Sequence, residues 1–310
     1  MQYGRLGQTD LEVSRVGFGT GSLGEMYGPL DEASAIRLVH EVIDQGINFI
    51  DTSRYYYSAE ERLGKALTPS TRQSVILATK AGRYGFDDFD FTRAGIRRGI
   101  EESLALLKTD YVDVLLMHDI EFADLRTVFE DGYGELLRIR DEGKCRYVGV
   151  SGGAMATMKR AMLELEIDVL LTYAKGSLLD DSIRTVLGPI ADEREVGLIN
   201  AAAVVLGLLT PGRLAIQIEH PAPLEVQRAA ERMRALCAER GVDIAFVANQ
   251  YALQRSGCVT TVVGVGRSST LRSAVEAERT PIDEELIADV LALRPPIADR
   301  IWRVGRPENN

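Results

Sequence analysis

The chain has 310 residues, of which 45% are hydrophobic and 26% charged, and its formal net charge is -10 at pH 7. This is the composition of a globular protein with a sizeable core. The acidic balance disfavours nucleic acid as a partner, because nucleic-acid binding needs a basic face. No apolar run approaches the ~20 residues that span a bilayer, so no membrane partner is expected. Residues 1–7 lack the plan of a signal peptide, and three widely spaced cysteines form no metal or disulfide pattern, which favours a cytoplasmic protein without a metal site.

Strand-like and helix-like segments alternate along the chain without a linker, which predicts a single domain over residues 1–310. We expect a small hairpin between 3–5 and 11–16, and later a C-terminal helix and tail. Strands are predicted at 16–20, 48–50, 74–78, 112–117, 146–150, 167–172, 197–200 and 260–263. Helices are predicted at 32–46, 60–67, 92–107, 155–165, 182–193 and 270–277. Eight strands alternating with helices indicate an α/β fold of the (β/α)8 TIM-barrel type.

A doubly wound sheet is the main alternative, since residues 17–21 read Gly-Phe-Gly-Thr-Gly. A dinucleotide-binding turn needs a third glycine at a fixed spacing and an acidic residue about 20 positions later. Both are missing, so we interpret this stretch as the tight exit of the first strand. The connection over 201–224 is unusually long and contains three prolines. It leaves the carboxyl end of the seventh strand and could fold over a ligand.

Residues able to do proton chemistry stand at the ends of three successive strands. In chain order they are Asp51 with Tyr56, then Lys80, then His118. The carboxyl ends of barrel strands meet at one mouth, where the chemistry of such barrels gathers. Alone, each residue has an ordinary structural interpretation: a helix cap, a surface tyrosine, a solvated lysine or a structural histidine. Together they predict a catalytic tetrad.

The tetrad is suited to proton transfer at an alcohol or carbonyl oxygen. A free phenol has a pKa near ~10, and a nearby ammonium lowers it, so Lys80 can activate Tyr56. Asp51 can hold Lys80 charged and in place, and His118 can orient the reacting oxygen. No member is a strong nucleophile or a carbanion sink, so hydride transfer to a bound nicotinamide is the natural complement.

The spacing of these four residues resembles the catalytic tetrad of the aldo-keto reductase superfamily. The resemblance covers nearly the whole chain, and within the superfamily the chain is most similar to L-galactose dehydrogenases, above all in the run 118–122. It implies a nicotinamide dinucleotide bound without a Rossmann unit and Tyr56 as general acid/base. The implied reaction is NAD(P)-dependent oxidation of a sugar lactol, such as that of L-galactose, at C1 to the lactone.

The resemblance also implies positions for cofactor and substrate contacts, although several differ from the common pattern. A Ser-Asn pair after strand five is here Ser151-Gly152, and a Gln at the end of strand six is Thr172. The implied cofactor-binding residues are Thr20, Gly21, Asp51, Ser151, Thr172, Leu206, Gly207, Gly264, Gly266, Arg267, Ser269 and Thr270. The implied substrate-binding residues are Tyr56, His118, His220 and Trp302.

The stretch after strand eight bears on the choice of cofactor. NADPH-specific relatives carry a Lys where this chain has Gly264 and an Arg where it has Thr270. Neither cation is present, which predicts a preference for NAD, with NADP possible through Arg267. We interpret Arg272 as a solvated charge at the end of a helix.

Trp302 lies in a basic C-terminal tail. It either packs on the barrel wall or, with His220, borders the sugar. Two alternatives to a sugar dehydrogenase remain: a general NADPH-dependent reductase of aldehydes and ketones, and a non-catalytic cofactor-sensing subunit. Turnover of an aldose with NAD+ or NADP+ discriminates among them. The pattern does not specify an oligomeric state.

Overall fold

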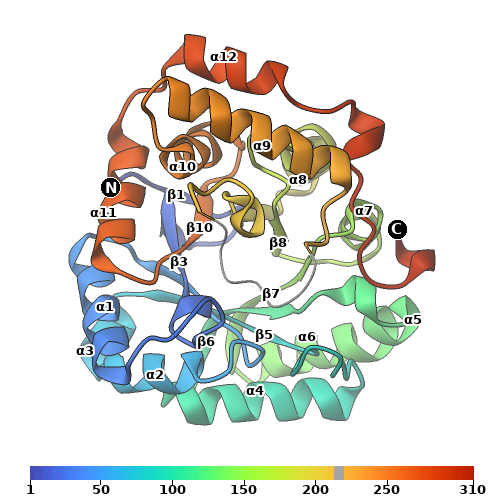
Figure 1. Ribbon diagram of the computed structural model, residues 1–310. Helices are drawn as coiled ribbons and strands as arrows, with labels where there is room; N and C mark the ends of the chain where they lie inside the picture. Colours follow the sequence, from blue (N-terminus) through green and yellow to red (C-terminus); the bar gives the residue numbers. More distant parts are fainter. Residues whose placement is uncertain (213–219) are drawn as a thin grey trace.

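Eight parallel strands close into a barrel with helices around it, which confirms the (β/α)8 fold (Figure 1). The structure, a computed structural model, describes residues 1–212 and 220–310. Each strand pairs with the next along the chain, and the last pairs with the first. The barrel strands are β3 Val16–Gly19, β4 Phe49–Asp51, β5 Ile76–Ala81, β6 Val112–Met117, β7 Cys145–Gly152, β8 Val169–Tyr173, β9 Gly197–Ala201 and β10 Thr260–Gly264.

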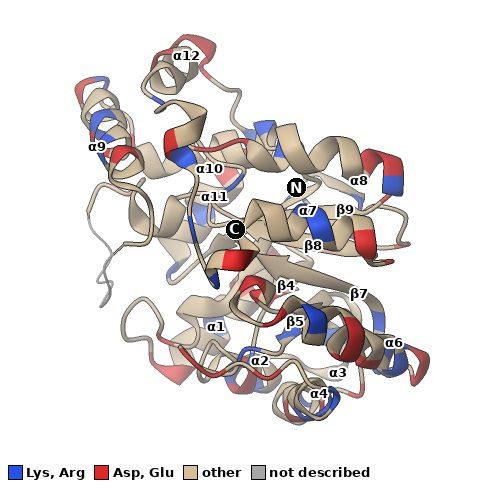
Figure 2. Cartoon of the chain, turned by 90° about the vertical axis from the view of Figure 1, so that its right-hand side faces the viewer, with Lys and Arg blue, Asp and Glu red and all other residues tan. Residues whose placement is uncertain are grey.

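The helices form the outer layer, and Figure 2 marks Lys, Arg, Asp and Glu positions along them. Asp31 and Thr92 cap α1 and α4 by accepting backbone N–H groups of the first turn, as their sequence positions predict. The helices are α1 Glu32–Asp44, α2 Ala59–Ala66, α3 Pro69–Gln73, α4 Arg93–Leu107, α5 Leu125–Thr127, α6 Tyr133–Asp141, α7 Met155–Glu164, α8 Gly188–Arg194, α9 Leu224–Glu239, α10 Ile244–Arg255, α11 Ser268–Arg279 and α12 Glu284–Ala292.

The predicted N-terminal hairpin is also confirmed, as β1 Tyr3–Arg5 paired antiparallel with β2 Glu12–Ser14. Leu6 and Leu11 beside it are buried in the same apolar cluster as the inward-facing strand residues. The hairpin therefore closes the amino-terminal end of the barrel.

The alternation of side chains along the strands decides which residues face the barrel interior. One apolar cluster fills the interior, and a second lies between the strands and the helices. Inner members stand two positions before three residues of the tetrad: Phe49 before Asp51, Ala78 before Lys80 and Leu116 before His118. Since residues i and i+2 share a face of a strand, these three side chains point inward at the mouth.

Several elements differ from the sequence-based expectation, among them helix α9, which was not predicted. The helical stretch 125–141 was not predicted, and its second part is a five-residue π-helical segment at Val128–Gly132. That segment interrupts the 3.6-residue repeat by which a helix is predicted from the sequence. Helix α10 was missed because it is buried on most sides and lacks a polar face. Lys80 lies inside β5 rather than after it.

None of the described helices is long and apolar enough to cross a membrane. Within residues 1–212 and 220–310, no group of His, Cys, Asp or Glu side chains is arranged to hold a metal ion. The three cysteines are free and buried. Of the long connection over 201–224, residues 213–219 lie outside the described part.

Candidate active site

Lys80 is the centre of the candidate site. Its side chain is 1% exposed, and its Nζ donates to Asp51 Oδ2 at 2.6 Å and to the Thr52 carbonyl at 2.9 Å. The third partner is the Tyr56 hydroxyl at 3.3 Å, and the ammonium also lies 4.9 Å from the centre of the Tyr56 ring. All three N–H groups are used, so the lysine is fixed and aims one of them at the phenol.

The phenol of Tyr56 keeps its proton in this environment. Burial and the nearby Asp51 carboxylate raise the pKa of Tyr56 well above its ordinary value. The net shift of the Tyr56 pKa is therefore upward, and not the lowering expected from a nearby ammonium, because desolvation and the Asp51 carboxylate dominate. Tyr56 is thus a proton donor at rest, and its base form arises only as the pH rises.

His118 presents a neutral imidazole to the same space. Burial, Lys80 and Arg83 lower the pKa of His118 well below 6.5. Its Nδ1 lies 3.0 Å from Ser53 Oγ, which accepts from the backbone N–H of Tyr55 at 3.1 Å. The Ser53 hydroxyl proton has no other acceptor among the described residues, so we assign it as donated to Nδ1. The remaining proton of His118 is then on Nε2, where it can be donated to a reacting oxygen.

A charged pair that the sequence analysis did not select lies beside His118. Arg83 donates to Asp119, and Asp119 Oδ2 lies 3.6 Å from His118 Nε2. The guanidinium also stacks 4.0 Å from the centre of the Tyr55 ring. Asp119 has a left-handed backbone with φ 53°, a strained conformation that is common at functional sites. The sequence signal that could have indicated Asp119 was the run 118–122, which the sequence analysis used only to support the family resemblance.

The residues expected to contact a cofactor lie where strands of the barrel end. Thr20 and Gly21 form a short turn after β3, and Gly264 ends β10. Arg267 is the N-cap of α11, with Ser269 and Thr270 in its first turn, and Gly266 comes just before. Leu206 and Gly207 are in a turn after β9, where Ala202, Val205 and Leu206 all have positive φ.

The remaining two positions use their hydroxyl protons differently. Ser151 Oγ donates to the Met117 carbonyl at 3.3 Å, and Thr172 Oγ1 donates to the Gly152 carbonyl at 2.7 Å. Both side chains are buried. Each hydroxyl can still accept a hydrogen bond, but its proton already has a partner in the main chain.

Unsatisfied oxygens at the mouth fit a nucleotide. Thr20 Oγ1 and Asp51 Oδ1 are buried without a hydrogen-bond partner among the described residues. Such groups are costly unless a ligand satisfies them. The hydroxyls of a ribose can donate and accept, so a nicotinamide nucleotide whose ribose reaches β3 and β4 would supply the missing partners.

His220 and Trp302 contact one another, and their rings are 5.7 Å apart in a T-shaped arrangement. Trp302 is 4% exposed and lies in an apolar cluster with residues of α9 and α10. The Lys175 ammonium lies 5.3 Å from the centre of the indole, so Trp302 is in contact with the loop that leaves β8. The structure therefore groups Trp302 with that loop and not with the four tetrad side chains.

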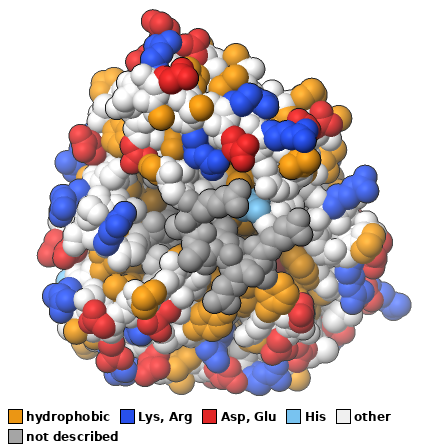
Figure 3. All heavy atoms as spheres, in the orientation of Figure 1, with side chains coloured by type: hydrophobic (Ala, Val, Ile, Leu, Met, Phe, Trp, Pro, Cys, Tyr) orange, Lys and Arg blue, Asp and Glu red, His pale blue; other side chains and the backbone are white. Residues whose placement is uncertain are grey.

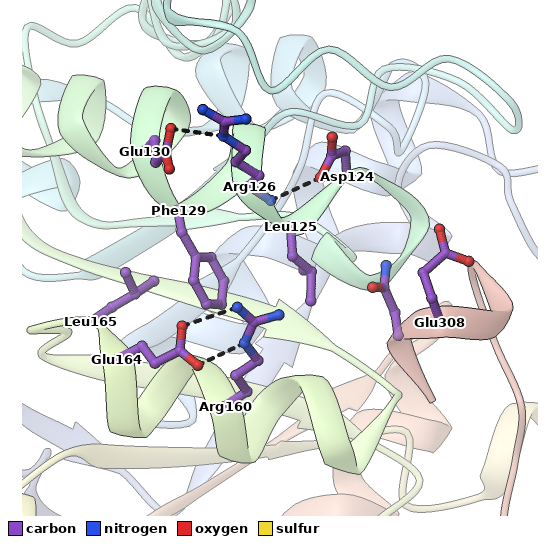
Figure 4. A pocket seen from close by; sticks show the side chains of 10 residues that line it. Asp124, Leu125, Arg126, Phe129, Glu130, Arg160, Glu164, Leu165 and Glu308 are labelled. Carbon is purple, nitrogen blue, oxygen red and sulfur yellow. Dashed lines mark hydrogen bonds and ion pairs between the residues drawn. The ribbon is translucent and has the colours of Figure 1, made fainter.

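Around the mouth, positive and negative side chains are interspersed, so no single sign dominates this face (Figure 3). A surface pocket of about 550 Å3 lies elsewhere, on the outer side of the barrel. Helices α5 and α7 and the end of the chain line it, with ion pairs Arg126–Glu130 and Arg160–Glu164 at its edges (Figure 4). It contains no residue of the tetrad.

Comparisons with known proteins agree with this geometry. The model of the Aldo/keto reductase family matches residues 15–294. L-galactose dehydrogenase of Arabidopsis thaliana is 35% identical, with 98% of each chain covered. D-threo-aldose 1-dehydrogenase of a Pseudomonas species is 27% identical, covering 92% of this chain and 95% of that one.

Among solved structures, the holo form of an aldo-keto reductase from Bacillus halodurans is similar, with a TM-score of 0.76 and 27% identity. The alignment covers 95% of this chain and 97% of that one. Members of the family use nicotinamide cofactors, which agrees with the unsatisfied oxygens at the mouth. With the family model matching most of the chain and the barrel closing as expected, the protein is an oxidoreductase that belongs to the Aldo/keto reductase family.

Proposed function

We propose that this chain oxidises the lactol form of an L-galactose-like aldose at C1 to the lactone, with NAD+ as the preferred acceptor. The observation that carries the proposal is the contact between Lys80 Nζ and the Tyr56 hydroxyl, beside a neutral His118. The similarity to two aldose dehydrogenases supports the choice of a sugar. The Arg83–Asp119 pair beside His118 supports it too, since charged groups bind the hydroxyls that a sugar carries.

The residues of the chain divide the proton chemistry between them. His118 donates from Nε2 to the anomeric oxygen O1 and fixes its position. Tyr56, in its phenolate form, removes the proton of the O1 hydroxyl while C1 becomes a carbonyl carbon. Lys80 stabilises the phenolate through the hydrogen bond that it already makes to the hydroxyl. The oxidised nicotinamide, when bound, accepts the hydride of C1.

A second candidate is the reduction of an aldehyde or ketone with NADPH. The raised pKa of Tyr56 favours this direction, because a protonated phenol is ready to donate to a carbonyl oxygen. In that case the same contacts operate in reverse. His118 polarises the carbonyl, and Tyr56 protonates the alkoxide.

The proposed contacts at the rim follow the sequence analysis. We include His220 and Trp302 as substrate-binding residues, supported by their mutual contact and by the proximity of Trp302 to Lys175. The preference for NAD+ is supported by the start of α11, where Gly264 and Thr270 carry no charge. Arg267 Nε lies 3.4 Å from Thr270 Oγ1, so this guanidinium already has a partner on its own turn.

The decisive experiment is a panel of aldoses, each assayed with NAD+ and NADP+, beside a panel of simple aldehydes with NADPH. We expect turnover of L-galactose or a closely related aldose, with a higher kcat/KM for NAD+. If only the aldehydes react, the reductase is the correct function. Exchanging Gly264→Lys together with Thr270→Arg should move the preference towards NADP+, and Arg272→Gln serves as the matched control.

A further inference from the structure

Asp119 directly follows His118, and the two side chains face the same space. In an extended strand, neighbouring side chains point to opposite faces. Strand β6 ends at Met117, and Asp119 has a left-handed backbone with φ 53° and ψ 54°, which interrupts this alternation. As a result, Asp119 Oδ2 lies 3.6 Å from His118 Nε2, the atom whose proton is available to a reacting oxygen. The carboxylate is therefore placed beside the reaction centre.

Two tyrosines from other strands support this placement of the Asp119 carboxylate. Burial is the main cause that raises the pKa of Tyr56, after β4, and of Tyr173, in β8, and the charge of Asp119 adds to the rise of both pKa values. Tyr173 stands two positions after the inner residue Leu171, so its side chain also points into the barrel mouth. A charge that acts on side chains from both sides of the mouth lies on the inner face of the barrel and not on its helix side.

The Arg83 guanidinium holds the Asp119 carboxylate in this position. Its Nη1 donates to Asp119 Oδ2, while Nε and Nη2 donate to the carbonyls of Gly85 and Phe86, both at 3.3 Å. Burial raises the pKa of Asp119, and the charge of Arg83 opposes that rise. A guanidinium stays charged in proteins, so it stabilises the ionised form of its partner, which accepts hydrogen bonds and donates none.

The second carboxylate oxygen, Asp119 Oδ1, has no hydrogen-bond partner within residues 1–212 and 220–310, and it is not one of the fully enclosed polar atoms of that part of the chain. A ligand can therefore reach it. The 3.6 Å between Asp119 Oδ2 and His118 Nε2 is too long for a hydrogen bond, so the Nε2 proton is not taken by this carboxylate. The two side chains thus offer a donor and an acceptor to a ligand, side by side.

A ligand with oxygens on neighbouring carbons matches this donor and acceptor. Hydrogen bonds to either group span about 3 Å, so groups this close bind oxygens that are themselves neighbours. At the lactol carbon of a sugar, O1 has two such neighbours, the ring oxygen and the hydroxyl on C2. The ring oxygen carries no proton and would be repelled by the carboxylate, whereas the C2 hydroxyl can donate to it. The pair therefore selects a hydroxyl on the carbon next to the reacting one.

We propose that the Asp119 carboxylate accepts a hydrogen bond from the hydroxyl on the carbon next to the reacting one, which makes the enzyme specific for 2-hydroxy aldoses and 2-hydroxy aldehydes. Arg83 acts through Asp119 as a positioning residue. His118 and Asp119 are both buried, so this hydrogen bond forms in a medium of low dielectric, where it is stronger than in water. The inference rests on the proposed function, because it names a feature that the same site requires in its substrate.

The test compares substrates that differ in one hydroxyl group. Oxidation of L-galactose is measured beside that of 2-deoxy-L-galactose, and reduction of glycolaldehyde beside that of acetaldehyde. In the wild type we expect kcat/KM to be roughly 10–100-fold higher for the hydroxylated member of each pair, the range for a hydrogen bond to a charged group. Asp119→Gly, which suits the left-handed backbone, should reduce each ratio by about tenfold or more. The ratio of L-galactose to L-fucose, which lacks the hydroxyl on C6, should be the same in both proteins.

Further variants separate recognition of the hydroxyl from loss of structure. Asp119→Gly leaves Arg83 buried without its ion-pair partner, so the double variant Asp119→Gly/Arg83→Met removes that charge and should show the same loss of discrimination. Arg83→Met alone should lower the ratios in part, because the carboxylate is no longer held. Asp131→Asn is the matched control, since it breaks an exposed ion pair with Arg93 at 3.1 Å and should leave both ratios unchanged.

If Asp119→Gly slowed the hydroxylated and the deoxy member of each pair by the same factor, Asp119 would only support the structure around His118, and the inference would be overturned. Equal kcat/KM values for both members in the wild type would overturn it as well. A wild type that prefers glycolaldehyde to acetaldehyde but oxidises no aldose would overturn the proposed function alone and leave the role of Asp119 supported. Turnover of none of these substrates would overturn both.

Discussion

The two halves of the barrel mouth are built in different ways. At the ends of β4, β5 and β6, long polar side chains face inward and hold one another, as in the contacts of Lys80 with Asp51 and Tyr56. At the ends of β7, β8 and β9 the side chains are small apart from Tyr173, and the backbone takes unusual shapes. Ala174, Ala202 and Val205 there all have a left-handed backbone.

This difference separates the part of the mouth that carries the proton chemistry from the part that shapes the surface around it. The first half supplies a proton path whose parts are fixed by side-chain hydrogen bonds. The second half supplies a surface whose shape comes largely from the main chain. Changes in the first half should therefore reduce kcat, whereas changes in the second half should alter binding or stability.

The largest effect is expected from Tyr56→Phe. Removing the hydroxyl removes the proton acceptor, so kcat should fall by roughly 10²–10⁴-fold, the usual contribution of a general acid or base. Affinity for the cofactor should stay nearly unchanged in a calorimetric titration. Tyr57→Phe is the matched control, because Tyr57 is 65% exposed and should tolerate the change. Loss of activity in Tyr57→Phe with an active Tyr56→Phe would reverse the assignment.

Lys80→Met should be next in size. It removes the group that stabilises the phenolate, and it leaves Asp51 buried without its ion-pair partner. Breaking one side of a buried pair costs about 3–5 kcal/mol of unfolding free energy. The double variant Lys80→Met/Asp51→Asn should recover much of this stability in denaturant titrations without recovering kcat. Recovery of both would make Lys80 a structural residue.

The pH profile tests the protonation state of Tyr56. Because its pKa lies well above 10, the phenolate fraction rises up to tenfold per pH unit across the neutral range. We therefore expect kcat/KM for lactol oxidation to rise with pH and that for carbonyl reduction to stay high until the phenol ionises. Stopped-flow rates in both directions between pH 6 and about 10 would measure this. A plateau of the oxidation rate at neutral pH would show that bound ligands lower the pKa.

Trp302 tests whether the second half of the mouth contacts the sugar. If the indole borders the substrate, Trp302→Leu should raise KM for the aldose by about tenfold, equivalent to roughly 1.4 kcal/mol, with kcat little changed. His220→Ala should act in the same direction. An unchanged KM with a lower unfolding midpoint would assign Trp302 to packing between the tail and the barrel.

The smallest effect is expected at the left-handed positions. Ala202 has φ 54°, a conformation that costs a residue with a Cβ about 1–2 kcal/mol. Ala202→Gly should therefore leave stability unchanged or raise it by up to about 1 kcal/mol. The neighbouring Ala201→Gly, in β9, should lower it by roughly 0.5–1 kcal/mol. If Ala202→Gly and Ala201→Gly lowered the unfolding free energy equally in urea titrations, the left-handed backbone would not determine stability in this half of the mouth.

The same difference between the two halves of the mouth explains which features could be predicted from the sequence. The barrel and the first half of the mouth were predicted, because apolar runs followed by Asp51, Lys80 and His118 are visible in one dimension. Arg83 and Asp119 were not selected, since their importance depends on which strand ends lie next to each other. The direction of the Tyr56 pKa shift was misjudged because the sequence shows the lysine partner but not how deeply the phenol is buried. Helix α10 escaped because a helix buried on several sides lacks a polar face.

The contacts of the C-terminal tail have a practical consequence for handling the protein. Asn309 donates to the carbonyls of Glu121 and Ala123, and its own carbonyl accepts from Thr157. An affinity tag or fusion partner attached after Asn310 would therefore emerge beside the segment that carries Asp119 and could pull on it. Met1 precedes the hairpin β1–β2, and the two ends of the chain lie on opposite sides of the view in Figure 1. Purification handles, surface immobilisation and reporter fusions are best placed before Met1.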